Sequence, residues 1–372
     1  MKYKVWVIGI ALLRLQLYYC LLLYIIQTIL GLLQVFLMSA LNIRKRRIAR
    51  ACPRAIIIII IIILLLFILI KKYYSQQPIH FRPYDPKLFE RVKGSIFEDF
   101  DNETGTKDGS FIVPNQVHFL FFNSSFIPYV HAVCVLAAFR NQRPEKIFFH
   151  TNVVEFTGEH WLKIKNTLGS VLEIRNITLP NEIFGQKFSQ NFHLWHAGDV
   201  TRIRILMKHG GIFLDNDSYV VRSLDAFRKY EMTIGIIDGP YLGTQVLIAN
   251  KDARFLKLWL ESYRDYNPDS WYYNAGQKPM REILIYKPEL VHTVPTLLGV
   301  HTLSERLYIW DRWENWRKYY SVHLIVRHRR YMDKVWNYFW WPYLDETNIC
   351  DYPKPFGVMA REIYSDFCPK NK

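Results

Sequence analysis

An unbroken run of eight isoleucines, Ile56–Ile63, lies within the wholly apolar stretch 55–70. Arg54 precedes this stretch and Lys71-Lys72 follows it. As a helix rising about 1.5 Å per residue, the stretch reaches about 24 Å, slightly less than a hydrocarbon core of about 30 Å. Flanking Arg and Lys side chains that extend to the lipid headgroups cover the difference. A buried core helix does not need eight consecutive isoleucines, so we predict a transmembrane helix over 55–72.

The positive charge of the chain is concentrated beside this segment. The net charge is +15, but residues 1–74 contain no Asp or Glu, and the rest of the chain carries only +4. The distribution argues against a nucleic-acid partner and favours a membrane. A second uncharged apolar stretch runs over 15–41, and the basic cluster 44–54 that follows it is expected in the cytosol. Two alternatives remain open: two spans from Met1, or one span with a functional start at Met38.

Both alternatives place everything after Lys72 in the lumen, and the sequon asparagines and the cysteines bear on that placement. N-glycosylation sequons give weak support, and they occur at Asn102, Asn123 and Asn176; a fourth, Asn216-Asp-Ser218, is expected to stay unmodified. Cys134 lies in an apolar helical pattern and is expected in the core. Cys350 and Cys368 could pair in an oxidising lumen.

The domain organisation follows from composition and periodicity. Residues 1–54 are an apolar extension and basic cytosolic segment, the polar residues 73–110 are a stem, and 111–372 form one lumenal domain. In that domain strand and helix patterns alternate, which predicts an α/β fold with a mostly parallel sheet flanked by helices. The expected strands are 117–122, 146–150, 171–175, 211–215, 232–237 and 245–249, and the expected helices are 129–140, 160–168, 192–209 and 253–266.

One segment of this domain indicates chemistry. A helix ends at Gly210-Gly211, and the short apolar strand that follows ends in Asp215-Asn216-Asp217. If the strand backbone stays extended, positions two apart point to the same side, so Asp215 and Asp217 face together. Paired carboxylates bind hard divalent cations such as Mn²⁺ or Mg²⁺, often together with substrate phosphates. A plain acidic turn is the alternative for an isolated Asp-x-Asp.

The same segment resembles a known family. Ala197-Gly198-Asp199-Val-Thr-Arg202, a helix, and Gly210-Gly211-Ile-Phe-Leu-Asp215-Asn-Asp217 are similar to the signature of the DXD-containing sugar-transferase family. That family is typified by the α1,4-galactosyltransferase and α1,4-N-acetylglucosaminyltransferase group and by the yeast initiating mannosyltransferase. A weaker similarity covers about 112–345. The resemblance implies a GT-A fold, retention of anomeric configuration and residence in the Golgi membrane with a lumenal catalytic domain.

The resemblance also implies roles for individual residues. Asp199 and Arg202, one helical turn apart, are expected to hold the nucleotide-sugar. Asp215 is expected near the ribose and the metal, and Asp217 as a direct metal ligand. These four are the predicted catalytic residues.

Three further positions are looser matches. Phe213 stands where the family usually has Tyr, and it is a predicted donor contact even though a hydroxyl contact to the donor phosphate is missing. Asn274, in Tyr273-Asn-Ala-Gly276, resembles a loop on the acceptor side and is a predicted donor contact. His323, in Ser321-Val-His, resembles a late motif whose His can complete the metal site, although a core histidine is an equal alternative.

The function expected from the resemblance is metal-dependent, retaining transfer of a sugar from a nucleotide-sugar, with UDP-Gal or UDP-GlcNAc as leading donors. The acceptor is expected to be a glycan on a glycolipid or glycoprotein. The first alternative is a catalytically inactive pseudo-transferase that binds carbohydrate or nucleotide-sugar. A metal-dependent phosphohydrolase is disfavoured, since that chemistry generally uses a two-metal cluster that the sequence does not suggest.

Overall fold

The computed structural model describes residues 84–90, 97, 101–236, 241–300, 304–308, 312–325 and 345–369. The predicted transmembrane helix 55–72, the extension 1–54 and much of the predicted stem lie outside these residues. Within the described part, no helix combines the length and apolar character needed to cross a membrane.

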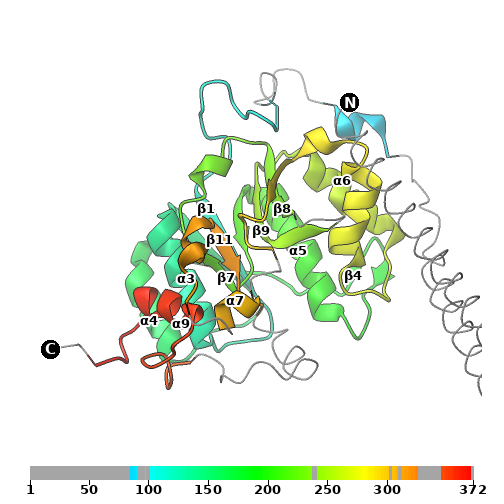
Figure 1. The fold of residues 1–372 in the computed structure, drawn as a ribbon. Helices are drawn as coiled ribbons and strands as arrows, with labels where there is room; N and C mark the ends of the chain where they lie inside the picture. Colours follow the sequence, from blue (N-terminus) through cyan, green and yellow to red (C-terminus); the bar gives the residue numbers. More distant parts are fainter. Residues whose placement is uncertain are drawn as a thin grey trace, which may run out of the picture. The chain divides into compact units, whose positions relative to one another are not determined.

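A seven-stranded sheet forms the centre of the domain, with the order β10-β8-β9-β6-β1-β2-β3 (Figure 1). Neighbouring strands pair in parallel except where β9 meets β6 and β8, so β9 alone runs against the other six. The predicted α/β fold with a mostly parallel sheet is therefore confirmed. The strands are β1 Gln116–Phe121, β2 Lys146–Thr151, β3 Leu172–Asn176, β6 Gly211–Leu214, β8 Met232–Ile236, β9 Leu242–Ala249 and β10 His292–Pro295.

Helices lie on both sides of the sheet (Figure 1). Helices α3 and α4 pack together with α9 on one side, and α5 packs with α6 on the other. Each of the four helices expected from the sequence is present within a few residues, although 3₁₀ geometry replaces the end of α6. The helices are α3 Tyr129–Gln142, α4 Glu159–Leu168, α5 His193–His209, α6 Arg254–Ser262, α7 Ser304–Tyr308 and α9 Pro355–Ile363.

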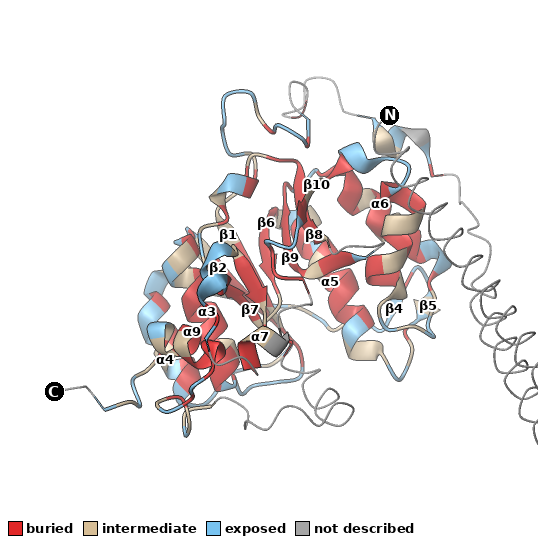
Figure 2. Cartoon of the chain, viewed as in Figure 1, coloured by how far each residue is buried: buried red, intermediate tan, exposed pale blue. Residues whose placement is uncertain are grey.

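Strand alternation explains why the sheet carries helices on both faces. Ile212 and Leu214 of β6 join the core beneath α3, whereas Phe213 between them joins the core beneath α5. Both sets are almost fully buried, as the red strands in Figure 2 show. A strand buried on both faces reads as a continuous apolar run, which is how this segment appears in the sequence.

Two small sheets were not expected from the sequence. Strands β7 Ser218–Val220 and β11 Ser321–His323 form an antiparallel pair beside the end of β6. A short hairpin, β4 Glu182–Ile183 with β5 Gln186–Lys187, precedes α5. Strands of two or three residues are too short to show a period of two in the sequence.

The structure also places the cysteines and sequon asparagines that bear on lumenal exposure. Cys134 is buried in α3, as predicted, and Cys350 and Cys368 form a disulfide. Asn102 is buried. Its side-chain amide donates to the carbonyl of Glu289 at 3.0 Å, and its side-chain oxygen accepts from the backbone N–H of Glu231. Asn123 and Asn176 are exposed. The sequon at Asn102 is therefore a poor glycosylation site in the folded domain.

Two glycines set the geometry of the connection from α5 to β6. Gly210 and Gly211 have φ angles of 66° and 104°, which L side chains rarely adopt. A Cβ on Gly211 would lie 2.6 Å from the carbonyl oxygen of Gln116 and 2.9 Å from Nε2 of His118. The strand can therefore start directly after the helix only because this position has no side chain.

We expect Gly211→Ala to lower the free energy of unfolding by about 2–5 kcal/mol, since left-handed backbone costs about 1–2 kcal/mol and overpacking about 1–3 kcal/mol. Gly109→Ala is the matched control. Gly109 also has a positive φ, of 75°, but a Cβ added there would meet no heavy atom of the described residues within 4 Å. Denaturant unfolding of the purified chain measures both. Equal losses in the two variants would contradict the steric account.

Beneath this connection lies a buried histidine pair. His118 donates from Nε2 to the carbonyl of Gly210 at 2.9 Å, so its Nδ1 accepts from Nε2 of His150 at 3.0 Å. Burial, with added repulsion from neighbouring cationic groups, lowers the pKa of both His118 and His150 to about 3. Both rings are neutral in the folded domain at physiological pH.

The histidine pair predicts a direction for acid destabilisation. In the unfolded chain each ring titrates near the ordinary pKa of about 6.5, so between pH 6.5 and 3 only the unfolded state takes up these protons. Above pH 6.5 the two rings therefore do not change the free energy of unfolding. As the pH decreases below 6.5, the free energy of unfolding falls by up to about 1.4 kcal/mol per pH unit for each ring. Urea unfolding at a series of pH values measures the slope. His150→Gln should flatten it, and an unchanged slope would contradict the assignment.

Candidate functional site

The two carboxylates of the Asp-x-Asp segment lie in a turn at the end of β6. The backbone N–H of Asp215 still follows the sheet and donates to the carbonyl of Gln245, and the N–H of Ser218 then donates to the carbonyl of Asp215, both at 2.9 Å. The expectation that an extended backbone aligns Asp215 with Asp217 is therefore wrong in detail. The turn brings the two carboxylates together instead.

The β7–β11 pair brings a third side chain to this turn. His323 pairs in register with Ser218, and the next N–H, that of Leu324, donates to the carbonyl of Asp217 at 2.9 Å. This register places Nε2 of His323 3.2 Å from Oδ1 of Asp217. The structure thus joins residues that are more than a hundred positions apart in the chain.

Asp215, Asp217 and His323 together form a donor set suitable for a divalent cation. One ligand atom from each lies within 4.8 Å of the other two. Their side chains retain 27%, 14% and 12% exposure, so the cluster is neither sealed in the core nor fully in solvent. Burial lowers the pKa of His323, but the charge and hydrogen bond of Asp217, together with the charge of Asp215, outweigh that effect, and the net shift is upward. A metal bound here would displace that proton, since only neutral imidazole is a ligand.

Arg202 connects this cluster to α5. Its guanidinium lies 3.3 Å from Asp199 and 3.1 Å from Asp215, and it donates to the carbonyl of Thr244 at 2.7 Å. Burial opposes the charge on Arg202, but Asp215 and Asp199 outweigh it and raise the pKa of the guanidinium. The guanidinium of Arg202 therefore links α5 to the turn that follows β6.

Asp199 is the most deeply buried acid of the site. Desolvation raises its pKa to about 7, against the opposing effect of Arg202 and with a further rise from Asp215. A carboxyl group with a pKa near neutrality is common in functional sites and uncommon among surface acids. Asp199 is thus suited to hydrogen-bond a ligand hydroxyl group.

The structure gives Phe213 and Asn274 roles that differ from ligand contacts. The ring of Phe213 is buried under Arg202, with the guanidinium carbon 5.2 Å from the ring centre. The side chain of Asn274 is buried and closes its own loop, because it exchanges two hydrogen bonds with the backbone of Asn267. Their predicted donor contacts stay predictions.

Sequence reasoning missed the contribution of β9. The carbonyl of Thr244 fixes Arg202, and the carbonyl of Gln245 accepts from both the N–H of Asp215 and the hydroxyl of Ser218. These are backbone groups, so no residue type could have indicated them. The only signal was the predicted strand itself, whose antiparallel direction was not foreseen.

Comparison with known proteins agrees with this geometry. Residues 136–234, which include α5, β6 and the Asp-x-Asp turn, match the family described as glycosyltransferase sugar-binding region containing DXD motif. Over these residues the chain therefore matches the sugar-binding region of DXD glycosyltransferases, and the predicted resemblance is confirmed.

The chain spans about two fifths to three fifths of the length of the two curated relatives described next. The chain is 26% identical to glucan organizing enzyme 1 of Cryptococcus neoformans, over 56% of this chain and 57% of that protein. It is 27% identical to mouse lactosylceramide 4-alpha-galactosyltransferase, over 36% of this chain and 39% of that protein. The glycosyltransferase GlyE of Streptococcus pneumoniae matches in structure with 14% identity and a TM-score of 0.39, over 67% of this chain and 63% of that one. A TM-score this low adds no argument about the fold.

The cluster predicts metal binding that depends on each of its three ligands. We expect Asp217→Asn and His323→Gln each to weaken Mn²⁺ binding by at least about tenfold, an effect that loss of outer-shell partners alone already reaches. Asp252→Asn, at an exposed aspartate, is the control and should bind like the unaltered chain. Electron paramagnetic resonance of free Mn²⁺ measures the affinity. Unchanged binding in both ligand variants would show that the cluster is not the site.

Proposed function

We propose that this chain is a metal-dependent glycosyltransferase that moves a sugar from a nucleotide-sugar to a glycan acceptor. The observation that carries the proposal is the convergence of Asp215, Asp217 and His323 beside the buried Asp199–Arg202 pair. The matched sugar-binding region spans four of these five residues, and the fifth, His323, reaches the site through β11.

The donor atoms present fit a divalent cation. Two carboxylates and one imidazole, together with the phosphate oxygens of a donor, make a mainly oxygen ligand set, which suits Mn²⁺ or Mg²⁺. When bound, such an ion would supply Lewis-acid stabilisation of the leaving diphosphate. Asp217 and His323 would hold it directly, with Asp215 completing the set.

The chain's own residues have distinct tasks in this proposal. Arg202 keeps Asp215 oriented and offers positive charge at the edge of the site. Asp199, with its pKa near neutrality, accepts a hydrogen bond from a sugar hydroxyl and so fixes the ring relative to the diphosphate. Phe213 supports the guanidinium from below, where the resembling family has a Tyr.

The finer parts of the proposal rest on the resemblance and on the relatives. They are a GT-A fold, retention of configuration, a UDP-Gal or UDP-GlcNAc donor and an acceptor on a glycolipid or glycoprotein. We also propose that the chain is a type II Golgi membrane protein with a lumenal domain. The apolar stretch 55–70 with its basic flanks supports the anchor, and the disulfide Cys350–Cys368 supports an oxidising compartment.

We expect Asp217→Asn to reduce transfer at saturating donor by at least about a hundredfold, because removal of a single electrostatic contact to the developing charge costs that much in other enzymes. The assay measures UDP release and labelled acceptor with UDP-Gal, UDP-GlcNAc and Mn²⁺ in parallel. Asp252→Asn is the matched control and should retain full rate.

Three results bear on the proposal in different ways. Metal-dependent transfer that disappears in Asp217→Asn supports it. Nucleotide-sugar binding without product, in every donor and acceptor combination, would support the inactive pseudo-transferase instead. Transfer that survives both chelation and Asp217→Asn would remove the metal cluster from the mechanism.

A further inference from the structure

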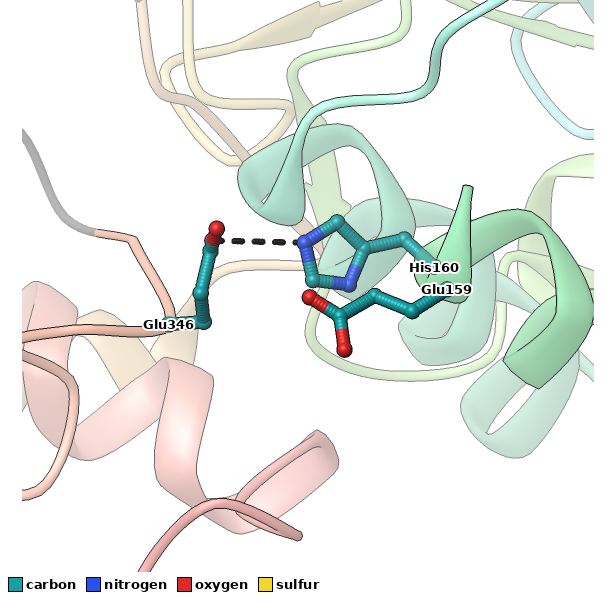
Figure 3. A group of neighbouring side chains, drawn as sticks. All are labelled: Glu159, His160 and Glu346. Atoms are coloured by element: carbon teal, nitrogen blue, oxygen red, sulfur yellow. Dashed lines mark hydrogen bonds and ion pairs between the residues drawn. The ribbon is translucent and has the colours of Figure 1, made fainter. Parts of the chain in front are cut away.

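A second group of metal-ligating side chains lies apart from the Asp-x-Asp turn. Glu159 and His160 are the first residues of α4, and Glu346 belongs to a turn near the C-terminus (Figure 3). One ligand atom from each of the three lies within 4.8 Å of the other two. We propose that these residues form a structural Zn²⁺ site that ties the C-terminal segment to α4.

The imidazole of His160 is buried and held in position. The residue is only 1% exposed, and its ring packs edge-on against Tyr364 with ring centres 5.7 Å apart. Its Nδ1 lies 3.3 Å from the hydroxyl oxygen of Tyr364, and its Nε2 faces the carboxylate of Glu346 (Figure 3). A metal-binding histidine typically donates its second ring N–H to an oxygen acceptor, which fixes the tautomer and leaves the other nitrogen free for the ion. Tyr364 fills that orienting position.

The distance between the two facing ligands fits a shared ion better than a direct ion pair. Nε2 of His160 and Oε2 of Glu346 are 3.3 Å apart. Charge-assisted N–H···O contacts are usually about 2.7–2.9 Å. Two ligands on tetrahedral Zn²⁺, each at about 2.0–2.2 Å from the metal, are about 3.3–3.5 Å apart. The observed separation corresponds to an edge of that tetrahedron.

The identity of the ion follows from the donors. Ca²⁺ and Mg²⁺ take oxygen ligands, whereas zinc binds both His nitrogen and Asp or Glu oxygen, and a water would take the fourth position beside these three residues. Glu159 lies in the first turn of α4, where the positive end of the helix dipole weakly opposes a bound cation. Direct coordination by three ligands outweighs that opposition.

The site would close a long connection. His160 and Glu346 are 186 positions apart, and the segment that follows Glu346 is joined to itself by the disulfide Cys350–Cys368. Lys163 and Asp366 form a second link between α4 and this segment, at 2.6 Å. A bound ion would strengthen the His160–Glu346 link and, beside the Lys163–Asp366 pair, hold the C-terminal segment against α4.

Substitution of Glu159 distinguishes a zinc site from a simple ion pair between His160 and Glu346. No hydrogen bond or salt bridge in the described part of the chain joins Glu159 to the other two residues, so an ordinary His160–Glu346 pair does not need it. The experiment uses the full chain with Asp217→Asn, which weakens the first metal cluster. After chelation the protein is titrated with Zn²⁺, and bound metal and melting temperature are measured.

We expect one Zn²⁺ to remain bound per chain after dialysis and to raise the melting temperature by several degrees, as preferential binding to the folded state requires. Glu159→Gln and Glu346→Gln should each weaken zinc binding by more than about tenfold. Glu155→Gln is the matched control, because Glu155 is an exposed glutamate four residues earlier in the chain.

Two outcomes would overturn the proposal. The first is a melting temperature that zinc does not change. The second is a zinc effect that Glu159→Gln leaves as intact as Glu155→Gln does. Neither readout uses transfer activity, so failure here leaves the proposed function standing, and failure of the transfer assay leaves this site standing. Should Asp217→Asn not fold, Glu159→Gln and Glu155→Gln are compared in the otherwise unaltered chain, where the first cluster contributes equally to both variants.

Discussion

The buried guanidinium of Arg202 is the interaction on which the site depends. It connects Asp199 on α5 with Asp215 beyond β6, and it lies over Phe213 and bonds to the backbone of β9. Breaking one partner of such a buried arrangement leaves an uncompensated charge, which typically costs about 3–5 kcal/mol. Arg202 therefore links α5 to β9 and to the Asp-x-Asp turn, in addition to the backbone pairing of β6 with β9.

Much of this arrangement could be read from the sequence because it is local. Asp199 and Arg202 are one helical turn apart, Gly210-Gly211 marks the end of the helix, and the apolar run before Asp215 has the length of a buried strand. Helix period, glycine and strand length act over a few residues, so pattern alone placed α5 and β6 within a residue of their observed bounds.

The parts that could not be predicted depend on long-range pairing. Strand β9 runs antiparallel to its neighbours, and its carbonyl groups organise the turn. His323 reaches Asp217 only because β11 pairs with β7 in one particular register. The grouping of Glu159 and His160 with Glu346 likewise arises from the packing of the C-terminal segment. Register over such separations is set by tertiary contacts that a single sequence does not display.

Charge balance explains why the main cluster calls for a cation. With His323 neutral, three carboxyl groups face one guanidinium, so ionisation of all three leaves two uncompensated negative charges in a partly buried site. That excess would repel a diphosphate, and burial makes the repulsion stronger than in water. A divalent ion would neutralise the excess before the donor arrives and would still offer open coordination positions to phosphate oxygens. When no ion is bound, the charges of Asp217 and Asp215 raise the pKa of His323 against the opposing effect of burial, whereas burial itself is the main reason that the pKa of Asp199 is raised.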